Sequence, residues 1–87
     1  SEIDSDTKNA YTAAQAYLTD DPTATINDPA QLTAGGYQRS QGVTWATGNM
    51  TIGSGSIILK SLTLEGAGKA NNSSVEYNGK FTFVAAP

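Results

Sequence analysis

Few side chains of this chain could carry out chemistry. Its 87 residues include no histidine and no cysteine, so the commonest general base, the commonest metal ligand and any thiolate are missing. Serine and threonine are frequent, but an activated hydroxyl needs an adjacent base. Lys60 or Lys80 could serve as that base in principle, yet nothing in the sequence marks either. We therefore predict no catalytic residue and a protein that is not an enzyme.

Phosphate and metal sites are equally hard to place. The segments Gly53-Ser54-Gly55-Ser56 and Gly66-Ala67-Gly68-Lys69-Ala70 lack the spacing and the context of a phosphate-binding loop. Asp20, Asp21 and Asp28 could donate oxygens to calcium, but their spacing is not that of a known calcium loop. We expect them to end a helix and to form turns, and we predict neither a metal nor a cofactor.

Charge and length limit the class of protein. Eight acidic residues against five Lys and Arg leave a formal charge of −3, which argues against a nucleic-acid partner because phosphate binding needs a basic patch. No run of about 18 apolar residues occurs, so the sequence predicts no membrane-spanning segment. The abundance of Thr, Ser, Asn and Gly suits an extracellular protein. We expect one domain over residues 1–87.

The amino-terminal segment predicts one helix, over about residues 3–19. Its apolar and small residues recur at helical spacing, and Pro22 disfavours helical geometry at Asp21. We expect the acidic start to be solvated and to interact favourably with the helix dipole; it consists of Glu2, Asp4 and Asp6. The side chains expected on the apolar face are Ile3, Thr7, Ala10, Ala14 and Tyr17, flanked by Tyr11 and Leu18.

A connecting loop is expected over residues 20–42. Within it, Asp28 and Pro29 are typical of a helix start and Gly35 of a left-handed helix end, so we expect one or two helical turns. Leu32 and Ile26 are its expected anchors to the core.

The remaining residues, 43–84, predict an antiparallel sheet. The run from Ile57 to Leu64 changes its alternation midway, which indicates either a strand with both faces covered in part or a bulge near Lys60-Ser61. Residues 65–73 are expected to form a polar loop.

The last hairpin allows two registers. A two-residue turn at Asn78-Gly79 would place Glu76 opposite Phe81. A three-residue loop with a left-handed Gly79 would instead pair Val75 with Phe81 and Glu76 with Lys80, which groups apolar residues and matches opposite charges. We predict this bulged loop.

Several of these segments together resemble a known family. The helical run Lys8-Asn9-Ala10-Tyr11-Thr12-Ala13-Ala14-Gln15-Ala16-Tyr17 is followed by Asp20-Asp21-Pro22. Further on, Leu32-Thr33-Ala34-Gly35-Gly36-Tyr37 precedes Gly42-Val43-Thr44. These segments resemble the globular region of a bacterial type IV pilin, namely the second half of the pilin helix with its exit, the end of the helix-to-sheet loop and the first strand. The apolar first half of the pilin helix and the cysteines of many pilins are missing here.

The resemblance implies a fold and a function. The expected fold is α+β, with the N-terminal helix packed on a three- to four-stranded antiparallel sheet. The expected function is that of a structural subunit of a type IV pilus on the bacterial surface. Its partners would be other pilin subunits, and it would reach the membrane only through the missing half-helix, on this chain or on a partner chain. The alternatives are a pseudopilin of type II secretion and a free-standing extracellular binding or adhesion module. We expect helix–sheet contacts at Tyr11, Ala14 and Leu18, and subunit contacts at Asp20, Asp21 and Lys69.

Overall fold

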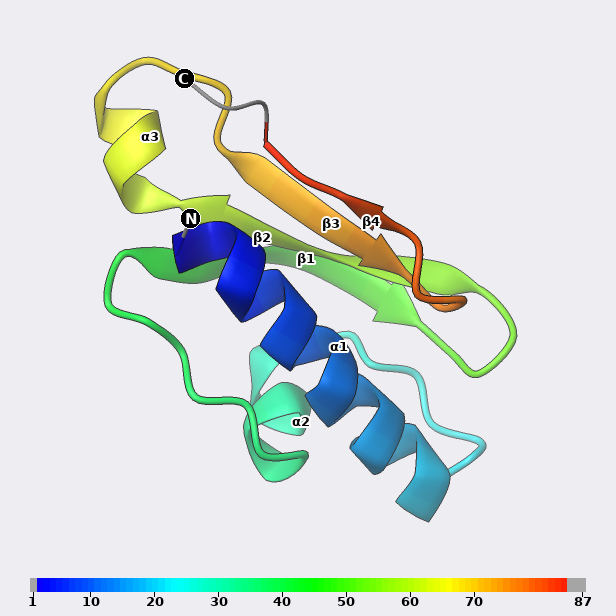
Figure 1. Cartoon of the computed structure of the whole chain (residues 1–87). Coiled ribbons are helices and arrows are strands. Elements are labelled where there is room, and N and C mark those ends of the chain that lie inside the picture. Colours follow the sequence, from blue (N-terminus) through cyan, green and yellow to red (C-terminus); the bar gives the residue numbers. More distant parts are fainter. Residues whose placement is uncertain (1, 85–87) are drawn as a thin grey trace.

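The chain folds into one helix laid across a four-stranded antiparallel sheet, as expected. The computed structural model describes residues 2–84 and measures 39 × 21 × 16 Å along its principal axes. The strands occur in the sheet in the order of the chain, β1-β2-β3-β4, and the class is α+β. In Figure 1, α1 crosses one face of the sheet and α2 lies beside it. The elements are α1 (Glu2–Asp20), α2 (Pro29–Ala34), β1 (Val43–Met50), β2 (Gly55–Ser61), α3 (Leu62–Gly66), β3 (Asn72–Glu76) and β4 (Phe81–Thr82).

Helix α1 buries one face against the sheet and against α2. It ends at Asp20, two residues before Pro22, where a helix is expected to end. Ala13 contacts the second helix so closely that a Cβ on Gly35 would lie 2.2 Å from the Ala13 carbonyl oxygen. Small residues allow this approach of two backbones. The buried residues of α1 are Ile3, Asp6, Thr7, Ala10, Ala13, Ala14 and Leu18.

The core lies between α1 and the inward face of the sheet. Ile57 and Leu59 of β2 alternate inward, and Val75 of the neighbouring β3 pairs with Ile57. This alternation follows from the two-residue period of a strand. The two expected anchors of the connecting loop, Ile26 and Leu32, are both fully buried.

The short helix α2 begins as predicted and ends differently. The Asp28 carboxylate accepts a hydrogen bond from the Ala30 backbone N–H, and the Gln31 side chain accepts one from the Asp28 N–H, which together form a capping box. The prediction of a left-handed Gly35 is wrong, because its φ is −81°. The left-handed residue is Gly36, with φ of +104°, so the chain turns one residue later.

The bulge expected near Lys60-Ser61 does not occur, because β1 and β2 stay in register there. The outward residues of β2, Ile58 and Lys60, are half-buried, as the alternative of two partly covered faces expects. Strand β2 stops at Ser61, whose side chain accepts a hydrogen bond from the Leu64 backbone N–H and so caps α3. The alternation changes because a strand gives way to a helix, whose period is different. The expected loop over residues 65–73 is correspondingly shorter, since α3 occupies its first residues and β3 begins at Asn72.

A bulge does occur, but in β1. The register with β2 shifts between Trp45 and Thr47, which brings Gly48 and Met50 onto the face that Trp45 occupies. The Trp45 ring lies across Gly48, where a Cβ would come within 2.4 Å of the indole. Glycine at this position therefore makes room for the indole.

The predicted hairpin register is confirmed. Val75 pairs with Phe81, the Glu76 N–H donates to the Lys80 carbonyl at 2.9 Å, and Gly79 has a φ of +84°. Phe81 then packs edge-on against Tyr11 of α1, with ring centroids 5.8 Å apart. The bulged loop thus places the aromatic side chain of the edge strand on the helix side of the sheet.

Candidate functional site

A buried carboxylate connects α1 to the segment before β1. Asp6 is 2 % exposed, so the expectation of a fully solvated acidic start is wrong for this residue. Its carboxylate accepts three hydrogen bonds, from the Tyr37 hydroxyl at 2.7 Å, the Ser40 hydroxyl at 2.6 Å and the Ser40 backbone N–H at 2.9 Å. A buried charge requires such compensation. Asp4 also departs from that expectation, since it accepts a hydrogen bond from the buried Ser73 hydroxyl at 3.3 Å.

The same cluster alters the acidity of Tyr37. Burial raises the pKa of the Tyr37 hydroxyl well above its usual value, and the hydrogen bond to Asp6 and the negative charge of that carboxylate add to the effect. Nearby Arg39 acts in the opposite direction. Because the hydroxyl keeps its proton, it remains a hydrogen-bond donor, and the cluster is suited to holding the chain in place.

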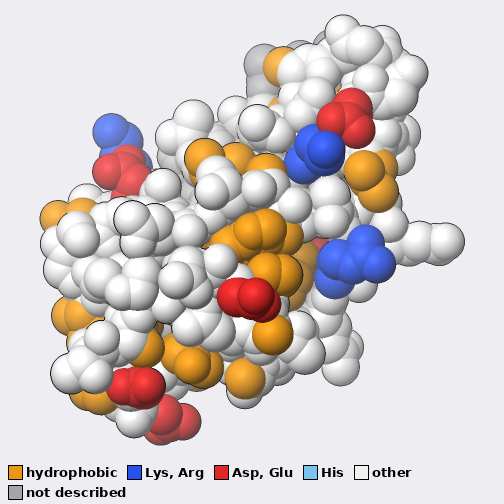
Figure 2. Space-filling model, turned by 180° about the vertical axis from the view of Figure 1, so that it is seen from behind, with side chains coloured by type: hydrophobic (Ala, Val, Ile, Leu, Met, Phe, Trp, Pro, Cys, Tyr) orange, Lys and Arg blue, Asp and Glu red, His pale blue; other side chains and the backbone are white. Residues whose placement is uncertain are grey.

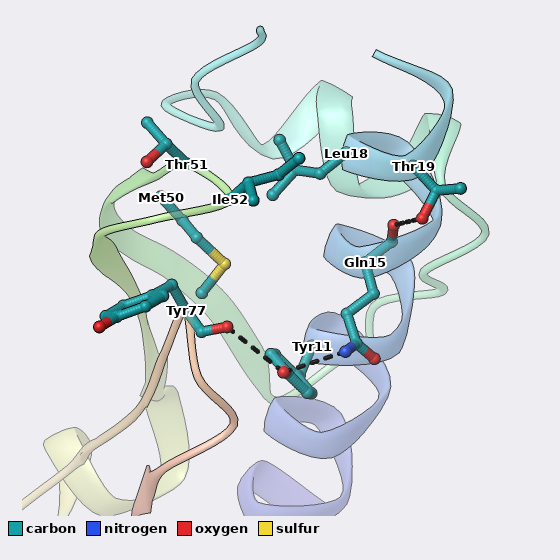
Figure 3. Close-up of a pocket in the computed structure, with 8 residues that line it drawn as sticks. All are labelled: Tyr11, Gln15, Leu18, Thr19, Met50, Thr51, Ile52 and Tyr77. Carbon is teal, nitrogen blue, oxygen red and sulfur yellow. Dashed lines mark hydrogen bonds between the residues drawn. The ribbon is translucent and has the colours of Figure 1, made fainter. Parts of the chain in front are cut away.

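A cavity of about 270 Å³ opens at the end of α1 beside the β1–β2 turn. Figure 3 shows Leu18 and Ile52 on one side and Tyr11 with Gln15 on another. Its polar groups already bond to each other, because the Tyr11 hydroxyl donates to the Tyr77 carbonyl at 3.3 Å and accepts from the Gln15 amide at 3.0 Å. The remaining lining residues are Thr19, Met50 and Thr51.

A second hollow, here called the α2–β1 groove, has a volume of about 320 Å³. Trp45 is half-buried in it, and Arg39 is its one charged side chain. Figure 2 shows hydrophobic side chains gathered near the centre of the view from behind, with an acidic side chain at their edge and a basic side chain further to one side. The groove is lined by Pro29, Ala30, Leu32, Thr33, Tyr37, Arg39, Thr44, Trp45 and Leu59.

One stripe along the exposed side of α1 is small and uncharged, with the exposed residues Lys8 and Gln15 beside it. We call the stripe of Ser5, Asn9, Thr12, Ala16 and Thr19 the outer face of α1; all five residues are exposed. A polar hollow of about 300 Å³ adjoins it, lined by Asn9, Thr12, Ala13, Gly35, Gly36 and Gln38.

The residues predicted to pack α1 on the sheet lie at its buried side. Ala14 is fully buried and Leu18 is 5 % exposed, while Tyr11 is half-buried and contacts both Phe81 and Tyr77. The residues proposed for subunit contacts are exposed: Asp20 ends α1, Asp21 follows it, and Lys69 lies in the loop after α3. The first two follow Thr19, which lines the cavity at the end of α1, and none of the three lines any of the hollows described above.

Sequence reasoning missed Asp6 and Trp45 as parts of local sites. The position of Asp6, three residues after Ile3 and four before Ala10, places it within the inward arc of the helix, and this spacing could have indicated its burial. The position of Trp45 at a bulge has no comparable local signal.

Two further features bear on function. Within residues 2–84, no group of three or more acidic side chains is arranged to hold a metal ion. In the same range, no helix combines the length and apolar character needed to cross a bilayer.

Comparison with protein-family models, with curated proteins and with solved structures finds no match.

Proposed function

We propose that this chain is the globular head of a structural subunit of a type IV pilus on the bacterial surface. The observation that carries the proposal is the position of α1, which covers the sheet with one face while its opposite side stays exposed. In the family that the sequence resembles, such a helix joins the head to the filament core. The function is assembly rather than catalysis.

The side chains of α1 support this proposal. Its outer face has no charge at any of its five positions, so a neighbouring helix could approach closely without the desolvation cost of buried charges. The adjoining polar hollow offers amide and hydroxyl groups from Asn9, Thr12 and Gln38 for hydrogen bonds. An apolar half-helix, on this chain or on a partner chain, would complete the filament core.

The two alternatives predict different behaviour. A free-standing binding module needs a ligand pocket, and the cavity at the end of α1 could be one. Its volume of about 270 Å³ lies just below the usual range for small molecules, and its tyrosine and glutamine are already bonded to each other. Because these polar groups already have hydrogen-bond partners within the chain, the cavity is better suited to a structural role than to ligand binding. A type II secretion pseudopilin would share the fold, and its loss would abolish protein secretion while surface filaments remained.

The proposal can be tested by labelling because this chain contains no cysteine. Thr47, exposed on β1, is replaced by cysteine (Thr47→Cys) in the gene with its natural upstream sequence, and intact cells of the native host are treated with a maleimide dye. We expect labelled filaments that are released by shearing, and no labelled filaments on cells with the unmodified gene. Dye confined to the cell body, or to soluble protein in the medium, would contradict the proposal.

A further inference from the structure

The α2–β1 groove has the features of a receptor for an acidic and apolar group. Its lining includes two aromatic side chains, Tyr37 and Trp45, but no carboxylate. Arg39 is exposed, and its Nη1 donates to the Val43 carbonyl at 2.8 Å. This bond fixes the guanidinium at the groove while the other N–H groups of an arginine remain available to an anion.

The end of α1 has the opposite character to the groove, because its charged side chains are acidic and an exposed apolar side chain lies in the nearby β1–β2 turn. Ile52, in the β1–β2 turn, is 55 % exposed, and it lines the same cavity as Leu18. Asp20 and Asp21 come two and three residues after Leu18, and both are exposed. Figure 1 shows the β1–β2 turn and the last turn of α1 on the same side of the molecule. We call the surface formed by Asp20, Asp21 and Ile52 the acidic end.

No basic residue close in the sequence offsets the negative charge of the acidic end. No Lys or Arg occurs between Lys8 and Arg39, and the Asp21 carboxylate accepts a hydrogen bond only from the neutral Thr23 hydroxyl among the described side chains, at 3.3 Å. The chain thus carries two carboxylates at the end of α1, next in sequence to Leu18 and Thr19 of the cavity that Ile52 also lines, and elsewhere an apolar hollow beside a guanidinium.

We propose that the α2–β1 groove of one copy of this chain receives the acidic end of a second copy. Ile52 would cover the apolar lining near Trp45, and a carboxylate of Asp20 or Asp21 would pair with Arg39, which is suited to two parallel hydrogen bonds with a carboxylate. The two surfaces are different parts of the same chain, so the contact is head-to-tail and leaves one free surface at each end. A contact of this kind that does not close into a ring generates an open filament.

This inference rests on the proposed function for its setting, because it names the contact between neighbouring heads. The two surfaces are small compared with the roughly 1,200 Å² that stable complexes usually bury. Isolated chains should therefore associate weakly, and a helical filament core would strengthen the contact by holding the heads at high effective concentration.

The test follows the NMR resonances of the isolated chain as the protein is diluted. The chain has a single tryptophan, Trp45, so its indole N–H is a unique reporter of the groove, and the amide of Asp21 reports on the acidic end. We expect both resonances to shift between about 0.05 and 2 mM protein, the range expected for a contact of this size. The variants Arg39→Glu and Asp20→Lys/Asp21→Lys should each show at least about tenfold weaker association, since each places like charges together.

Mixing the two variants makes the test specific. The groove of the Arg39→Glu variant carries a carboxylate that complements the lysine-bearing end of the second variant. The second contact is complementary as well, because the unchanged Arg39 groove of the lysine variant faces the unchanged acidic end of the Arg39→Glu variant. The mixture should therefore regain the Trp45 shift of both chains and form alternating assemblies, while each variant alone stays monomeric. Lys80→Glu is the matched control, because it makes the same charge change at an exposed residue outside both surfaces, and it should behave like the wild type. Absence of dilution shifts in the wild type, shifts at other residues, or a mixture that stays monomeric would each overturn the inference.

A cellular measurement separates this inference from the proposed function. Arg39→Glu is introduced beside Thr47→Cys in the natural gene, and labelled filaments are counted. We expect fewer filaments, and recovery when Asp20→Lys/Asp21→Lys is added to the same chain. Unchanged filaments would refute the groove contact and leave the pilus proposal standing, whereas a failure of Thr47→Cys alone to label filaments would refute the pilus proposal itself.

Discussion

At the scale of single residues, the most constrained group in this chain is the Asp6 carboxylate. It accepts hydrogen bonds from two residues that are 31 and 34 positions away, so it holds the loop before β1 against the first turns of α1. No buried side-chain N or O atom within residues 2–84 lacks a hydrogen-bond partner. A cluster in which every group is satisfied favours one arrangement of the chain, because any other would leave a charge buried without partners.

The Tyr37 hydroxyl allows a prediction about pH. Tyr37→Phe removes one donor to Asp6, and we expect it to lower the free energy of unfolding by about 1–3 kcal/mol at neutral pH, as for hydrogen bonds to charged groups. The folded pKa of Tyr37 is raised, so its contribution is complete below the ordinary tyrosine pKa near 10 and is lost as the pH rises through the folded value. The stability difference between wild type and variant should therefore shrink above about pH 10.

Urea denaturation at a series of pH values between about 7 and 11, which spans the ordinary tyrosine pKa, measures this difference. Tyr77→Phe is the control, because Tyr77 is 40 % exposed, and its difference from the wild type should stay near zero throughout. A Tyr37→Phe difference that grows above about pH 10 would show that the hydroxyl is not held in its neutral form.

At the scale of elements, the fold depends on close contact between two helices. A Cβ on Gly35 would lie 2.2 Å from the backbone oxygen of Ala13, which is closer than any carbon–oxygen contact allows. The φ of Gly35 is −81°, a value open to any residue, so glycine is needed here for space rather than for backbone conformation. The contact positions α2, and with it one wall of the α2–β1 groove.

This contact predicts the effect of adding one methyl group. Gly35→Ala should lower the free energy of unfolding by about 2–3 kcal/mol or more, because two backbones must separate to admit it. Gly66→Ala is the matched control, since nothing lies within 4 Å of its added Cβ, and alanine in a helix costs no stability relative to glycine. Chemical denaturation compares the two. Equal stability of both variants would show that α1 and α2 are not in this close contact.

At the scale of the whole molecule, the two sides of α1 differ in burial, and under the proposed function they would have separate roles. The buried side is closed by the sheet and α2, and its substitution would affect folding. The outer face of α1 contributes nothing to the core of this chain, so its side chains are free to serve assembly. Folding and the proposed function can therefore be separated by substitutions on one helix.

Ala16→Lys tests this separation. Ala16 is exposed on the outer face of α1, and lysine has nearly the same helix propensity as alanine, so the thermal midpoint of the isolated chain should change by only a few degrees. In cells that carry the Thr47→Cys label, the same substitution should abolish labelled filaments, since a charge would be buried between neighbouring helices. As a control, Thr47→Lys, on the exposed side of the sheet, should leave filaments intact when the dye is replaced by immunolabelling. Normal filaments with Ala16→Lys would mean that this face is not an interface.

Much of the fold could be predicted from sequence because its signals are local. The apolar spacing and Pro22 predict helix α1, and Asp28-Pro29 predicts the start of α2. In the last hairpin, the register that pairs Val75 with Phe81 could be chosen because it groups apolar residues. In each case the deciding interactions join residues a few positions apart. The pilus function stays a proposal, because local pattern and resemblance carry it.

Other features were decided only by the tertiary structure. The hydrogen bonds of Asp6 depend on Tyr37 and Ser40, and the groove depends on the packing of Trp45 of β1 near Leu32 of α2. The partners of Asp6 and of Trp45 do not follow from the neighbours of either residue in the chain. They arise when separate elements pack, because only then does the free energy of burying a charge, a hydroxyl or an indole depend on what lies on the other side.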